Sequence, residues 1–173
     1  MNTKEIYNKT EGLAQFKTYL LLLMMTMIFV NCSNDDEGTF QVPESAVNKA
    51  LALVPGTVTE SESEIEDGVA AWKVEITTQQ GAEVEVYCRQ DNDELLRIDG
   101  ESGPFDYNIV PGNGLIDFNQ AKAIAAGETA EDLENWQLRP EDKYNNQWVY
   151  TLDFDDTKVY INAVDGTVLD VES

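Results

Sequence analysis

Residues 71–89, AWKVEITTQQGAEVEVYCR, carry the clearest structural signal in the chain. Apolar and polar side chains alternate along residues 72–76 and again along residues 84–88. A period of two predicts strands with one buried face, because successive side chains of a strand point to opposite sides. The turn residues Gln80 and Gly81 separate the two runs, so the stretch predicts an antiparallel hairpin.

The segments on either side of this hairpin complete a first structural unit. Residues 43–53 predict a short helix, because apolar side chains at helical spacing form one stripe. The stripe consists of Val47, Ala50, Leu51 and Val54. Residues 57–66 are β-prone but heavily acidic and predict an exposed or edge strand. Asp67 and Gly68 predict the turn that follows it, and residues 95–98 predict a short last strand.

The same order of elements then occurs a second time. Residues 101–115 are rich in Gly and Pro and predict a linker. Asp117 and Gln120 then have the spacing of a helix capping box. Strand patterns follow at residues 136–139, 148–154, 159–161 and 167–171. We therefore predict a first repeat at residues 43–100 and a second repeat at residues 116–173.

Two such repeats predict an α+β fold in which each repeat is one helix packed on an antiparallel sheet. Trp72 and Trp148 begin corresponding strands, and we expect both in the core. Each repeat is small for independent stability. We therefore expect the two to pack together or to share a continuous sheet.

The charge balance of the chain is strongly acidic. Its 173 residues include 11 Lys and Arg, 33 Asp and Glu and no His, which gives a formal net charge of −22. Such a surface repels phosphate backbones, so nucleic acid is not an expected partner. Without His the chain cannot form a Ser-His-Asp triad, a Cys-His dyad or a His-ligated zinc site. We therefore predict a protein that is not an enzyme and that uses no cofactor.

Residues 1–31 are expected to be a signal peptide. Residues 19–30 form an apolar run that, as a helix, would rise about 18 Å and fall short of the roughly 30 Å hydrocarbon core. Lysines precede this run and a polar tract follows it, as in secretory signals. Cys32 stands directly behind the run and resembles the cysteine of a bacterial lipobox, although Asn31 occupies a position where Gly, Ala or Ser is usual. The resemblance implies cleavage before Cys32 and attachment of lipid, such as palmitate, to it.

Residues 32–42 are polar and acidic and are expected to form a lipidated tether. A serine followed by acids resembles the signal that exports lipoproteins to the cell surface in one group of Gram-negative bacteria. The residues that carry this resemblance are Ser33, Asn34, Asp35, Asp36 and Glu37. They imply an outer-membrane lipoprotein exposed on the cell surface, with a periplasm-facing lipoprotein as the alternative. The mature chain would carry a net charge of −23.

The two repeats resemble PepSY domains. The first does so through residues 46–53, 72–76 and 84–87 and the polar turn before Leu95. The second does so through residues 121–125, 148–152, 159–161 and 165–169. The resemblance implies a cystatin-like α+β fold. Because PepSY modules occur in metallopeptidase propeptides, it also implies that the chain restrains a secreted or envelope peptidase. The family has no catalytic residues to transfer, and we assign none.

Metal ligands and nucleophiles are sparse in the sequence. Asp153, Asp155 and Asp156 are weak candidates for a calcium site, against the simpler interpretation of a solvated hairpin turn. Cys88 alternates with buried positions and has no His or basic cluster near it in the sequence. We therefore expect it to be a small buried side chain without nucleophilic function.

Two further sets of residues are candidates for contact with a partner. Tyr87 and Tyr160 occupy matching outward positions, where they would serve as contact anchors or pack between the repeats. Four glutamates alternate on one face of the predicted edge strand, namely Glu60, Glu62, Glu64 and Glu66. They protect an exposed strand against aggregation or, alternatively, form a docking surface for a basic partner.

These patterns favour a non-enzymatic, lipid-anchored binding module of the cell envelope that inhibits or regulates a peptidase. Two alternatives stay open, namely a protein that binds a cation or small ligand and a structural envelope component. The expected partners are the membrane, through the lipid anchor, and a secreted or envelope peptidase. The sequence does not specify the oligomeric state.

Overall fold

The structure is a computed structural model that describes residues 41–173. Within this range the helices are α2 (Glu44–Leu53), α3 (Phe118–Ala125) and the 3₁₀ helix η1 (Asp142–Tyr144). The strands are β1 (Gly56–Glu66), β2 (Val69–Thr78), β3 (Glu83–Arg89), β4 (Leu95–Ser102), β5 (Leu133–Glu141), β6 (Gln147–Phe154), β7 (Lys158–Asn162) and β8 (Val168–Glu172). The described chain is therefore α+β.

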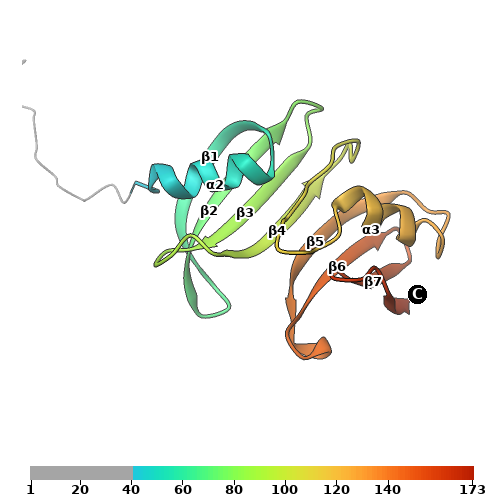
Figure 1. The fold of residues 1–173 in the computed structure, drawn as a ribbon. Coiled ribbons are helices and arrows are strands. Elements are labelled where there is room, and N and C mark those ends of the chain that lie inside the picture. Colours follow the sequence, from blue (N-terminus) through green and yellow to red (C-terminus); the bar gives the residue numbers. More distant parts are fainter. Residues whose placement is uncertain (1–40) are drawn as a thin grey trace, which may run out of the picture. The chain divides into compact units, whose positions relative to one another are not determined.

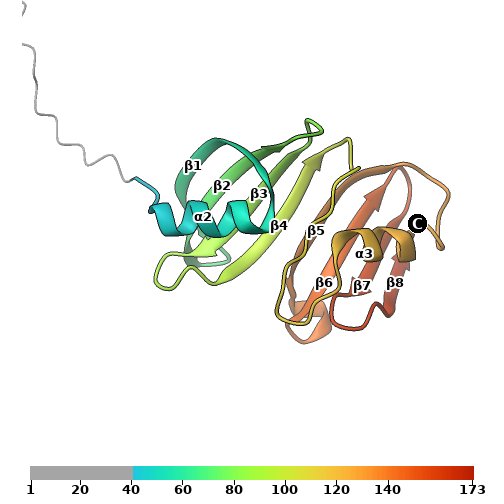
Figure 2. The same ribbon diagram turned by 45° about the horizontal axis from the view of Figure 1, so that its top comes forward.

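The strands form one antiparallel sheet whose order follows the chain from β1 to β8 (Figure 1 for β1 to β7, Figure 2 for β8). The first hairpin turns where the sequence predicts it. Asp67 and Gly68 adopt left-handed φ angles of 49° and 80°, which a two-residue type I′ turn requires at both central positions. Strand β1 lies at one edge of the sheet, as its alternating glutamates predict.

The α-helices α2 and α3 lie over the same face of this sheet, which we call the helix face (Figure 2). Helix α2 contacts β1, β2 and β3, whereas α3 contacts β6 and β7. We call the opposite side of the sheet the back face. Because side chains alternate along each strand, apolar residues cover the helix face and most charged strand residues point to the back face.

The hydrophobic core fills the space between the helices and the sheet. It includes Val74 and Ile76 of β2 in the first repeat and Leu152 and Ile161 in the second, all fully buried. Trp72 is buried as expected. Trp148 stands near the start of β6, where it is only partly buried and packs against the rim of the core.

The buried side of α2 differs slightly from the predicted stripe. Ala50 and Val54 are buried as expected, but Val47 and Leu51 are only partly buried. Ala46 is fully buried instead. The two small alanines let the helix backbone approach the sheet closely, so the larger aliphatic side chains lie at the margins of the contact.

Helix α3 begins with the predicted capping box. The Asp117 carboxylate accepts a hydrogen bond from the backbone N–H of Gln120 at 2.8 Å. The Gln120 side-chain oxygen accepts one from the backbone N–H of Asp117 at 3.1 Å. These bonds satisfy donors at the first turn that have no partner within the helix.

The two halves of the sheet meet where β4 pairs with β5. This ladder has three residue pairs, and in the last of them Gly100 lies opposite Trp136. A Cβ atom on Gly100 would collide with the indole ring of Trp136, so only glycine fits there. The pairing confirms the expectation that the two repeats share a continuous sheet.

A chain of aromatic rings supports this junction from the helix face. The rings of Tyr107 and Phe118 are 5.4 Å apart, and those of Phe118 and Trp136 are 4.3 Å apart. The Trp136 indole N–H donates to the Tyr107 hydroxyl at 2.9 Å. Tyr107 and Ile109 belong to the stretch predicted as a linker, and both are buried. That stretch therefore contributes to the core.

Candidate functional site

The back face holds most of the positive charge of the described chain. Residues 41–173 contain 8 basic and 28 acidic side chains, a net charge of −20. Six of the eight basic side chains are in ion pairs with carboxylates, and five of these six come from strands that expose alternate residues on the back face. They are Lys73, Arg89, Arg97, Arg139 and Lys158, with Lys143 of η1 as the sixth. The back face is therefore the polar surface on which function is best sought.

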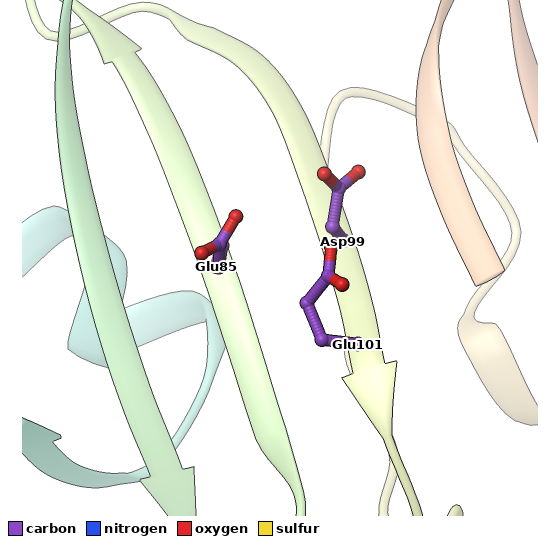
Figure 3. A group of neighbouring side chains, drawn as sticks. All are labelled: Glu85, Asp99 and Glu101. Atoms are coloured by element: carbon purple, nitrogen blue, oxygen red, sulfur yellow. The ribbon is translucent and has the colours of Figure 1, made fainter. Parts of the chain in front are cut away.

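Three carboxylates meet on the back face of the first repeat (Figure 3). Glu85 of β3 lies directly opposite Asp99 of β4, and Glu101 follows two positions along β4. One oxygen of each carboxylate lies within 4.8 Å of the others. Like charges on directly opposed strand residues destabilise a sheet unless cations offset them.

Two cations of the chain pair with two of these three carboxylates. The Lys73 ammonium lies 2.6 Å from Glu85, which also accepts a hydrogen bond from the Tyr87 hydroxyl at 2.6 Å. Arg97 donates to both oxygens of Asp99, through Nε at 2.7 Å and through the terminal nitrogen Nη2. Glu85 and Asp99 are therefore held in ion pairs, whereas Glu101 lies beside them without an ion pair in residues 41–173. A metal ion would have to displace Lys73 and Arg97 to use them.

The pKa values reflect how deeply this network is buried. Burial raises the pKa of Asp99 above its usual value, and the Arg97 guanidinium opposes that shift. Burial, followed by the neighbouring Asp99 and Glu85 charges, raises the pKa of Glu101. The hydrogen bond to Glu85 raises the pKa of the Lys73 ammonium, so Lys73 keeps its charge. The network therefore stabilises the charge of Lys73, whereas burial disfavours the charged forms of Asp99 and Glu101.

A second network joins the tip of the β1–β2 hairpin to the sheet junction. Glu66, at the end of β1, lies 3.0 Å from Arg97 of β4 and 3.7 Å from Arg139 of β5. Arg139 also lies 3.1 Å from Asp67 and 3.3 Å from Glu141. The two arginines thus connect elements of both repeats through the same glutamate.

A cavity of about 430 Å³ opens beside this network. It lies between the β1–β2 turn, the start of β4 and the segment that connects β5 to β6. Both repeats therefore contribute to its wall. A volume in this range is typical of sites for small ligands or side chains.

The structure places the predicted calcium candidates in the turn after β6. Asp153 pairs with Lys158 at 3.0 Å. Asp155 shares a hydrogen bond with Glu134, which raises the pKa of Glu134. The backbone N–H of Asp156 donates to Glu131 at 3.2 Å. Among residues 41–173, the group of three candidate ligands that the fold brings together is instead Glu85, Asp99 and Glu101.

Tyr87 occupies the expected outward strand position, but it is buried there and cannot serve as an exposed contact anchor. Its side chain is only 4% exposed, because the Arg97 guanidinium lies 5.0 Å from the ring centre and its hydroxyl bonds to Glu85. Tyr160 lies beside Tyr144 and under Lys143, within the second repeat. Neither ring packs between the repeats.

Cys88 is a free, fully buried thiol, as expected. Burial raises its pKa to about 11, which keeps the thiol protonated and unreactive near neutral pH. The predicted lipid-attachment residue Cys32 and the predicted export signal, Ser33, Asn34, Asp35, Asp36 and Glu37, lie outside the described residues. Within residues 41–173 no helix is long and apolar enough to cross a bilayer.

Sequence reasoning missed the residues that form the back-face networks. Arg97 and Arg139 stand at polar positions of their strands, so the alternation of apolar and polar residues indicates that both face the same side. Their convergence on Glu66 joins residues that are 31 and 73 positions apart in sequence. The only available signal was scarcity, since a cation in so acidic a chain is expected to have several anionic partners.

Comparison with known proteins identifies the repeats. The family model of the peptidase propeptide and YPEB domain, PepSY, matches residues 43–88 and again residues 115–172. No curated protein sequence matches the chain. A solved structure of a presumed lipoprotein from Clostridium difficile 630 is 20% identical, with a TM-score of 0.35, and covers 79% of this chain and 95% of that one. Since the two family matches together span more than half of its length, the chain belongs to the PepSY family and carries two copies of the domain.

Proposed function

We propose that this chain is a non-enzymatic binding module of the bacterial envelope that binds a secreted or envelope peptidase and regulates it. The observation that carries the proposal is the pair of PepSY matches, because the family takes its description from peptidase propeptides. The carboxylates of the back face support it, since Lys73 and Arg97 already occupy two of the three that would otherwise be available to a metal ion.

Each repeat is then a cystatin-like unit that presents a surface, with no reacting group. In both repeats the helix covers one face of the sheet and leaves the back face available to a macromolecule. The acidic surface speeds encounter with a basic partner by electrostatic steering, so salt should slow the association.

Peptidase regulation is tested with the full-length chain purified in detergent. Its binding to a panel of secreted metallopeptidases is measured by biolayer interferometry, and their activity is measured on a fluorogenic peptide. Binding with inhibition or altered activity is the expected result for at least one peptidase. If no peptidase in the panel binds or changes its activity, the proposed regulation is wrong.

The module is anchored by lipid on Cys32 and displayed on the outer membrane at the cell surface. The sequence around Cys32 supports this part of the proposal, and the lack of a spanning helix in residues 41–173 is compatible with it. Metabolic labelling with palmitate should mark the wild-type chain and spare the Cys32→Ala variant. Proteinase K added to intact cells should remove the chain, and protection until the outer membrane is broken would instead indicate a periplasm-facing lipoprotein.

A further inference from the structure

The cavity at the sheet junction has a wall of two kinds. Val69, Leu96 and Pro140 give it an apolar side. Glu66, Asp67 and Asp142 give it three carboxylates against the single guanidinium of Arg139. A ligand that fills it must therefore combine methylene groups with a polar head.

The charges decide which sign that head carries. Arg139 is already shared among Glu66, Asp67 and Glu141, at 3.7, 3.1 and 3.3 Å. An anion entering the cavity would have to take Arg139 from these carboxylates and would meet their repulsion. A cation would meet an excess of negative charge, so the cavity selects for positive ligands.

Three residues that line the cavity have polar side-chain atoms that can accept further hydrogen bonds. No residue of the described chain donates a hydrogen bond to the carboxylate of Asp142, the first residue of η1. Asn146 uses its backbone N–H on the Glu141 carbonyl at 3.0 Å, and its side-chain amide has no bond within residues 41–173. Asp67 keeps an exposed carboxylate, with 68% of its side chain accessible.

We propose that this cavity receives an arginine side chain of a protein partner. The three-carbon stem would lie along Val69, Leu96 and Pro140, and the guanidinium would donate to Asp142 and Asp67. A planar guanidinium carries several N–H donors in a fixed fork, so it can bond both carboxylates at once, whereas a lysine ammonium is a single point charge. A bare metal ion would make no use of the apolar side.

The inference rests on the proposed function only in taking the partner to be a protein. It makes the cavity, to which both repeats contribute, the specificity site of the module. A partner would therefore need an exposed arginine within its docking surface, and a chain folded as one repeat alone would not offer the complete site.

The test uses the ¹⁵N-labelled full-length chain in detergent, titrated with the peptide acetyl-Gly-Arg-Gly-amide. The amide signals of Gly68, Asn145 and Asn146 should shift, because these residues lie in or beside the wall of the cavity. A peptide with citrulline in place of arginine is isosteric but neutral and should produce no shifts. Equal binding of the citrulline peptide, or shifts confined to other parts of the sheet, would overturn the proposal.

Variants of the chain then show which carboxylate binds the guanidinium of the peptide. Asp142→Asn should weaken binding of the arginine peptide about tenfold, through loss of a charge-assisted hydrogen bond. Asp106→Asn removes the same charge from an exposed position outside the cavity and should leave the affinity unchanged. Arg139→Gln should tighten binding about threefold, since it removes the competing cation. Equal effects of the two aspartate variants, or weaker binding by Arg139→Gln, would show that the cavity does not bind the cation as proposed.

For each variant, the amide signals of residues far from the cavity show whether it has kept the native fold. The titration contains no peptidase, so its outcome is independent of the assay for peptidase regulation. Peptide binding without any effect on a peptidase would overturn the proposed function and leave the cavity assignment standing. Regulation of a peptidase without binding of the arginine peptide would overturn the cavity assignment and leave the proposed function standing.

Discussion

Single buried groups on the strands set how this protein responds to pH. The thiol of Cys88 is fully enclosed on the helix face of β3, and burial raises its pKa from 9.0 to about 11. In the unfolded chain the thiol ionises near pH 9, whereas in the folded chain it stays protonated until about pH 11. Between these values the unfolded state alone loses the proton, so the free energy of unfolding falls as pH rises.

We expect this effect to be visible as a difference between two chains. Across pH 9 to 11 the wild type should lose about 2 kcal/mol more stability than the Cys88→Ala variant, which has no thiol to ionise. Urea unfolding at several pH values measures both chains, and the tyrosines and lysines that titrate in this range are common to them. A constant stability difference from pH 9 to 11 would show that the thiol is not held protonated.

At the scale of single elements, β1 is the strand that needs protection against edge-to-edge pairing with another chain. It has eleven residues, lies at the edge of the sheet and pairs only with β2 among the described strands. Glu60, Glu62 and Glu64 are exposed and pair across to back-face positions of β2, so they share one side of the strand. Within residues 41–173, Glu62 is the one of the three that is in an ion pair, with Lys73 at 3.7 Å. Like charges in a row repel a second copy of the same edge.

Neutralising this row should therefore allow edge-to-edge pairing. The triple variant Glu60→Gln, Glu62→Gln and Glu64→Gln is expected to form dimers and larger species as its concentration rises. Sedimentation velocity at several concentrations measures this association. The control variant Asp106→Asn, Glu128→Gln and Asp132→Asn loses the same charge from exposed positions off the edge. If both triple variants associate equally, net charge and not the β1 edge controls solubility.

At the scale of the whole described chain, the junction between β4 and β5 makes two repeats into one sheet. Three residue pairs form this ladder, and the ring of Trp136 packs over the bare backbone of Gly100. A methyl group at Gly100 would force Trp136 out of its place and break its hydrogen bond to Tyr107. The junction should therefore be sensitive to a change of one carbon atom.

Gly100→Ala is expected to lower the free energy of unfolding by about 3 kcal/mol through overpacking. Gly112→Ala is the matched control. Gly112 has a φ of +79° but no atom near its missing Cβ, so only the left-handed backbone cost of about 1 kcal/mol applies. Urea unfolding followed by tryptophan fluorescence and by far-UV circular dichroism measures both variants. Equal losses would mean that Trp136 is not held against Gly100.

Local features of this protein follow from its sequence alone. The alternation in residues 72–76 and 84–88, the turn at Asp67 and Gly68, and the cap formed by Asp117 and Gln120 each depend on neighbours within a few positions. Backbone preferences and side-chain period act at that range, so these elements could be predicted. The repeat of the pattern, and with it the PepSY resemblance, could be predicted for the same reason.

Other features depend on which strands become neighbours, and these required the tertiary structure. Gly100 stands at the edge of the stretch predicted as a linker, but the ring of Trp136 packs against it. Tyr87 occupies an outward strand position but is covered by Arg97. The cavity exists only because the β1–β2 turn lies beside β5 and η1. Such contacts join residues that are tens of positions apart, and no period or propensity in one segment records where the other will lie.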